Sequence, residues 1–290
     1  MTSDPRSATL ELLWSLWSEM GVPGLQRSHA SSAIDPEPLI AWTPQLAGGD
    51  ARLLGLALDW CIANHDQVAR IRLPGIAKTL PASAARALAG FNGALVKHGV
   101  QWRPTAEASR LDSSRKTVAL PLERPALVRF RIRALCGVKA RAEILALLLA
   151  AGRNDGDAAQ LTPVGIARRS VERVLSNLTA AGLVVARGTQ RRHRFRLHDA
   201  AAFKRLVGGG GLGWVNWNDA LAFVAEVNSL WEQRKARPAV RRVNAAASFG
   251  VLRQLADALG FGTPPGSVER ADLFEALLPW GVLAIQRLGQ

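Results

Sequence analysis

The sequence is poor in cysteine, in acidic residues and in long apolar runs. The two cysteines, Cys61 and Cys136, lie far apart, which argues against a disulfide scaffold and against a cysteine-based zinc site. The longest apolar run, residues 144–151, covers about eight residues, whereas a helix needs about 20 to cross a bilayer. The first residues lack the basic and apolar segments of a secretory signal. We therefore expect a cytoplasmic protein that does not span a membrane.

The shortage of acidic residues leaves a large positive charge. The chain has 290 residues, and 37 Lys and Arg against 23 Asp and Glu give a formal net charge of +14. The excess is uneven, because residues 1–50 carry −4 whereas residues 101–198 carry +12, of which residues 139–198 carry +7. The hydrophobic fraction of 48% is that of a globular chain. The composition therefore indicates a folded protein, and the positive charge indicates a polyanionic partner.

Apolar residues recur at helical spacing along most of the chain, which predicts a mainly α fold. A chain of this length accommodates two or three domains. We predict a helical N-terminal domain (1–100), a linker with a connecting helix (101–138), a central domain (139–198) and a helical C-terminal domain (199–290). The connecting helix covers residues 126–135, although the alternation in VRFRIR leaves a strand open. The other helices expected outside the central domain cover residues 8–20, 36–46, 51–63, 82–98, 217–234, 245–259 and 271–288.

The candidates for catalysis are weak. Asp35 and Glu37 could be paired carboxylates, but the Asp-Pro-Glu order is typical of a helix start, with Asp as the N-cap and Glu in the first turn. Cys61 and the histidines do not have the spacing of a metal site. His29 lacks the partners of a Ser-His-Asp triad. We therefore expect no catalytic, cofactor-binding or metal-binding residues, and no enzymatic activity.

The central domain has the element order of a winged helix-turn-helix. In the longer helix Val171, Val174, Leu175 and Leu178 form one apolar stripe. Gly165 stands where the turn needs a residue that tolerates positive φ. A hairpin with alternating polarity follows the helix and forms the wing. The expected helices cover residues 139–151, 158–162 and 167–181, and the strands cover residues 183–187 and 192–197.

The segment 165–184, GIARRSVERVLSNLTAAGLV, resembles the core of bacterial winged-helix regulators of the MarR and ArsR type. Ser170-Val171, Leu175, Leu178 and Gly182-Leu183-Val184 match the family pattern in register. The resemblance implies a DNA-binding domain. More faintly, the whole chain resembles uncharacterised bacterial proteins with a helical N-domain, a central winged helix and a Trp-containing helical tail. Some of these are encoded beside nucleotidyltransferase-like toxin or defence genes.

The winged-helix pattern implies specific DNA contacts. A helix of about four turns fits the major groove, where Arg makes bidentate contacts with guanine. Arginines of the wing would contact phosphates or the adjacent minor groove. The residues expected to bind DNA are Arg168, Arg169, Ser170, Arg173, Asn177, Thr189, Arg191, Arg192 and Arg194.

These observations favour a sequence-specific regulator of transcription that binds double-stranded DNA. We expect a cytoplasmic repressor that forms a homodimer and takes no cofactor. The alternative is an antitoxin or accessory subunit that binds a neighbouring toxin or nucleotidyltransferase, with or without autoregulation. In that case the acidic N-terminal region or the tryptophan-bearing C-terminal helices would hold the protein partner.

Overall fold

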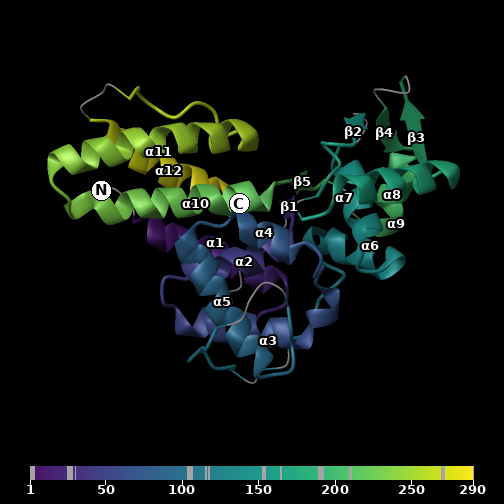
Figure 1. Ribbon diagram of the computed structural model, residues 1–290, viewed down its shortest axis with the longest axis horizontal. Helices are drawn as coiled ribbons and strands as arrows, with labels where there is room; N and C mark the ends of the chain where they lie inside the picture. The colour runs from purple at the N-terminus through teal and green to yellow at the C-terminus, as the bar shows by residue number, and fades with distance from the viewer. Residues whose placement is uncertain are drawn as a thin grey trace.

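The chain is mainly helical, as expected from its sequence (Figure 1). Helical structure extends over both ends of the chain, and short strands occur chiefly in the central part. The computed structural model describes residues 4–24, 29, 31–102, 107–114, 116, 118–151, 155–163, 165–188, 193–208, 211–268 and 272–289.

The N-terminal helices begin at residues that their sequence marks as caps. Asp4 accepts a hydrogen bond from the backbone N–H of Arg6, and Asp50 accepts one from Leu53, so each carboxylate satisfies an N–H that a helix start leaves unpaired. The sequence did not predict the short helix α4, which has only seven residues. The helices are α1 (Pro5–Glu19), α2 (Pro36–Leu46), α3 (Ala51–Ala63), α4 (Leu73–Thr79) and α5 (Ala82–Val96).

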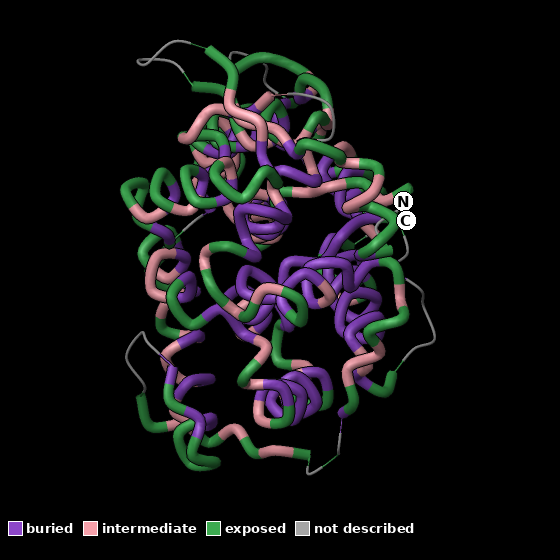
Figure 2. The backbone as a smooth tube through the Cα atoms, turned by 90° about the vertical axis from the view of Figure 1, so that its right-hand side faces the viewer, coloured by how far each residue is buried: buried purple, intermediate pink, exposed green. Residues whose placement is uncertain are grey.

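The C-terminal helices are α10 (Trp217–Glu232), α11 (Pro238–Leu259) and α12 (Leu273–Leu288). α10 packs against α1 and α2, α12 packs against α1, and α11 packs against α10 and α12 (Figure 1). One hydrophobic core thus joins the two ends of the chain. The sequence boundaries at residues 100 and 199 therefore do not separate two cores. We call this joined unit the helical body. Figure 2 shows its buried residues gathered in the interior, with exposed turns outside.

Tryptophans anchor the core of the helical body. Trp17, Trp60 and Trp217 are almost fully buried. Each ring N–H still donates a hydrogen bond, that of Trp217 to the carbonyl oxygen of Ala33 at 2.8 Å. Burial of such large rings contributes strongly to stability when their polar N–H is satisfied. Trp217, at the start of α10, thus supports the fold from within, as Trp17 and Trp60 do.

His29 is buried against the same core. Its ring makes an edge-to-face contact with Trp217 at 5.4 Å between centroids, and its Nε2 lies 2.8 Å from the Ser32 hydroxyl. Burial lowers the pKa of His29 from 6.5 to about 4. The native protein therefore keeps this imidazole neutral at a pH where an exposed histidine takes up a proton.

We expect the free energy of unfolding to fall by about 2 kcal/mol between pH 7 and pH 5 because of His29. The pKa of His29 is lower in the native state than in the unfolded chain. Below the pKa of the unfolded chain, the unfolded chain therefore binds a proton that the native state does not, and this favours unfolding. Urea unfolding at both pH values measures the change. His29→Gln should remove this part of the pH dependence, and an unchanged dependence in the variant contradicts the assignment.

The central part of the chain forms a separate small core beside the helical body (Figure 1). The connecting segment is a helix, α6 (Val128–Cys136), and not the strand that its alternation left open. The sequence did not predict the last helix of this part, α9 (Ala200–Val207). The other elements are α7 (Ala140–Ala151), β2 (Gly156–Asp157), α8 (Arg168–Ala180), β3 (Val184–Arg187) and β4 (Arg194–Leu197).

The strands of this unit form an antiparallel sheet in the order β2-β4-β3. The hairpin register pairs Val184 with Leu197, both of which are buried in the small core. The predicted short helix at 158–162 is wrong: residues 158–161 form only a turn, which Asp157 closes by accepting bonds from Ala159 and Gln160. The unit of α7, α8 and this sheet is called the winged-helix unit below.

Candidate nucleic-acid interface

A tight turn leads into α8. Gly165 adopts a φ of +86°, a region that glycine enters without the penalty of a Cβ atom. Ile166 is buried under the turn, and Val171 and Leu175 have no exposed surface. The predicted glycine and apolar stripe are confirmed, with Val174 only half-buried at the margin. The stripe fixes which face of α8 is turned to solvent.

The outward face of α8 carries three of the expected residues. Arg169, Arg173 and Asn177 are exposed and follow one another at intervals of four, so they form one row along the helix. Because successive helical residues are about 100° apart, this row lies on the side away from the buried stripe. Ser170 is half-buried at the edge of this face. The row therefore presents two cationic side chains and one amide to solvent.

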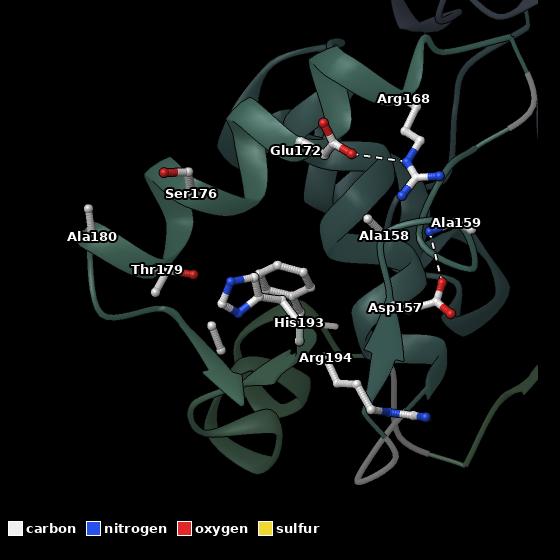
Figure 3. A pocket seen from close by; sticks show the side chains of 12 residues that line it. Asp157, Ala158, Ala159, Arg168, Glu172, Ser176, Thr179, Ala180, His193 and Arg194 are labelled. Atoms are coloured by element: carbon white, nitrogen blue, oxygen red, sulfur yellow. Dashed lines mark hydrogen bonds and ion pairs between the residues drawn. The ribbon is translucent and has the colours of Figure 1, made fainter. Parts of the chain in front are cut away.

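A second row of α8 faces the wing. Arg168, Glu172 and Ser176 line a groove of about 1110 Å³ between α8 and the sheet (Figure 3). The wing lines the other side with His193 and Arg194, among others. Arg168 and Arg194 thus line the same groove, whereas the row of Arg169, Arg173 and Asn177 does not line it.

The base of the wing is held by the loop before β2. Arg194 is exposed and donates from Nη2 to the carbonyl oxygen of Asp155 at 2.6 Å. Arg196 pairs with the Asp155 carboxylate at 3.7 Å. Three expected wing residues, Thr189, Arg191 and Arg192, lie outside the described residues. Their contact with DNA stays a prediction.

The turn before α8 lies directly against the helical body. A Cβ atom at Gly75 in α4 would lie 2.2 Å from the Cα of Gly165, and one at Gly165 would lie 2.5 Å from the carbonyl oxygen of Arg72. Distances below 3.0 Å require the backbone to move. Both glycines are therefore needed for this approach of two backbones, which seats the winged-helix unit on α4.

A buried ion cluster lies at the same junction, and we call it the junction cluster. Glu143 of α7 accepts from Arg72 at 2.9 Å and from Arg129 and Arg133 of α6 at 2.7 Å. All members are buried, and their charges balance. The helical body and the winged-helix unit are therefore joined by shared ion pairs. The junction cluster consists of Asp35, Glu37, Arg72, Arg129, Arg133 and Glu143.

Asp35 is the N-cap residue of α2, as expected, but its carboxylate makes no capping hydrogen bond and instead pairs with Arg72 at 2.7 Å. Glu37 does lie in the first turn of α2, but it binds Arg72 at 2.6 Å and Arg133 at 2.8 Å. Sequence reasoning missed the cluster, since its members are brought together only by the tertiary fold.

The electrostatics of the junction cluster follow from burial and pairing. Burial alone would raise the pKa of Glu143, but Arg133, Arg72 and Arg129 outweigh it and lower that pKa. In the same way Arg129 and Arg72 hold the pKa of Asp35 well below its usual range. Burial dominates at Glu37, whose pKa is raised. The cluster is therefore a set of buried charges that depend on one another.

Several arginines of the central basic segment are buried or form hydrogen bonds within the fold. Arg129 and Arg133 are buried in the junction cluster and do not face solvent. Arg131 donates to backbone carbonyl oxygens, including that of Gly208 at 3.1 Å. Arg124 donates to the carbonyl oxygen of Ser18 at 2.6 Å. Arg124 and the arginines of α6 thus support the fold, whereas Arg169 and Arg173 of α8 are exposed and can meet a polyanion.

Comparisons with protein-family models, with curated proteins and with solved structures give no match to this chain. Among its described residues no helix combines the length and the apolar character needed to cross a membrane.

Proposed function

We propose that the protein is a cytoplasmic regulator of transcription, a repressor, that binds double-stranded DNA with α8 and the wing. The observation that carries the proposal is the exposed row of Arg169, Arg173 and Asn177 on a helix whose other face is buried. A helix of 13 residues is about 20 Å long and can lie in the major groove.

The chemistry of the row fits base edges. Arg169 and Arg173 can each donate two hydrogen bonds to O6 and N7 of guanine, and Asn177 can pair with the N6 and N7 atoms of adenine. Each such contact discriminates between bases by about 1–3 kcal/mol. The groove between α8 and the wing is lined by Arg168 and Arg194. Arg194 would position the duplex through its phosphates, whereas Arg168, in the first turn of α8, can reach a base edge. We expect a symmetric dimer on a two-fold operator.

The test is binding to duplex DNA from upstream of the protein's own coding sequence, followed by fluorescence anisotropy. We expect Arg169→Ala and Arg173→Ala each to weaken binding by roughly 5- to 150-fold, which corresponds to about 1–3 kcal/mol. Affinity of the wild type should also fall steeply between about 50 and 200 mM salt, since phosphate contacts release counterions.

Arg253→Ala is the matched control. Arg253 is an exposed arginine of α11, which lies at the opposite end of the molecule from α8 (Figure 1). Its removal should leave affinity within about twofold, because an exposed charge far from the contact is largely screened. Equal losses in all three variants would mean that only net charge matters, and the assignment of α8 would then be wrong.

A further inference from the structure

Glu172 is an acidic side chain in the row of α8 that lines the groove beside the wing, next to the row of Arg169, Arg173 and Asn177 that the proposed function assigns to base edges. It lies one turn after Arg168 and accepts a hydrogen bond from the Arg168 Nε at 2.9 Å (Figure 3). Both side chains are well exposed, at 68% for Arg168 and 51% for Glu172, and both line the groove beside the wing. A carboxylate at this place repels the phosphates of any duplex.

That repulsion makes Glu172 unfavourable for binding without sequence preference. A charge that weakens every phosphate contact improves recognition only where a particular base offers it a donor. In the major groove cytosine offers its N4 amino group, which accepts no hydrogen bond and pairs with carboxylates. Guanine O6 and N7 and thymine O4 are acceptors and repel a carboxylate, and adenine carries the acceptor N7 beside its N6 amino group. Glu172 can therefore favour one base pair and penalise others.

The same carboxylate orients Arg168. Its bond to Nε uses one edge of the guanidinium group, and a guanidinium group can present its two terminal nitrogens as parallel donors. An exposed pair of this kind adds little to stability. Its geometry can still direct the donors of Arg168 toward the bases, because long side chains otherwise sample many rotamers.

We propose that Glu172 is a specificity-determining residue, which accepts a hydrogen bond from cytosine N4 and holds Arg168 toward a neighbouring base pair. This inference rests on the proposed DNA binding through α8. Removal of the Glu172 charge should weaken binding to the preferred duplex and strengthen binding to other duplexes, whereas removal of an arginine should weaken binding to both.

The test compares wild type with Glu172→Gln on two duplexes. One is the duplex that the wild type enriches from a randomised pool, and the other has the same composition in scrambled order. We expect the variant to bind the scrambled duplex more tightly, since one repulsive charge is gone. Its preference for the enriched duplex should fall by roughly 5- to 150-fold.

Glu232→Gln is the matched control, because Glu232 also forms an exposed pair with an arginine, Arg6, at 3.0 Å on the helical body. The Glu232→Gln variant should bind the enriched and the scrambled duplex with affinities within about twofold of the wild type. Equal tightening of Glu172→Gln on both duplexes overturns the inference while the proposed function stands. A wild type that enriches no duplex overturns both. Urea unfolding of Glu172→Gln should match wild type, which excludes a folding defect.

Discussion

Replacement of Glu143 by glutamine is expected to lower the free energy of unfolding by about 3–5 kcal/mol. Glu143 has no exposed surface and pairs with Arg72, Arg129 and Arg133. Glutamine preserves the shape of the side chain but removes its charge. The buried arginines then lose a counter-charge that water cannot replace, and breaking a buried pair in this way costs more than the pair itself contributes.

Urea unfolding followed by circular dichroism measures this loss. Glu232→Gln again provides the comparison, since the pair of Glu232 with Arg6 is exposed and its removal should cost no more than about 1 kcal/mol. Because the junction cluster joins the helical body to the winged-helix unit, the wild type should unfold in one transition. A Glu143→Gln variant as stable as Glu232→Gln would show that the cluster does not support the fold.

Replacement of Gly165 or Gly75 by alanine is the second change that should lower the free energy of unfolding strongly. A Cβ atom at Gly75 would lie 2.2 Å from the Cα of Gly165, so the two backbones must separate. Overpacking of this kind costs about 1–3 kcal/mol. Gly165→Ala should cost roughly a further 1–2 kcal/mol, because its φ of +86° is unfavourable for alanine.

Gly90→Ala is the control for this pair. Gly90 lies within α5, and a Cβ atom there would meet no other atom within 4 Å. Alanine at a helical glycine with free space should stabilise by about 0.5–1 kcal/mol. Denaturant midpoints of the three variants give the comparison. If Gly75→Ala is as harmless as Gly90→Ala, the turn before α8 is not seated on α4 in solution.

The sequence is sufficient for features that depend on local periodicity. The apolar stripe of α8, the positive φ of Gly165 and the hairpin of the wing all follow from residue types at fixed spacing. The short helix expected at 158–162 was wrong because a single turn closed by Asp157 has the same sequence signals as a helix start. Local patterns thus located the candidate interface, but they assigned a helix to a turn and missed the short helices α4 and α9.

Long-range contacts could not be predicted in this way. Glu143 and Arg72 are 71 residues apart in the chain, and Glu37 and Arg133 are 96 apart. In sequence, such arginines resemble surface charges and add to an apparent basic segment. These arginines are buried only when α6 and α7 pack beside α2 and α4, and no local pattern in the sequence indicates that packing. The common core of the two chain ends was missed for the same reason.

The most direct test of DNA recognition by α8 is enrichment of duplexes from a pool with a randomised centre. We predict that the wild type enriches a defined motif that contains guanine, and that the double variant Arg169→Ala, Arg173→Ala loses the preference at those guanines. The same motif for both proteins would contradict recognition through this row of α8. No enrichment by the wild type would contradict sequence-specific DNA binding itself and would favour the protein-interaction alternative.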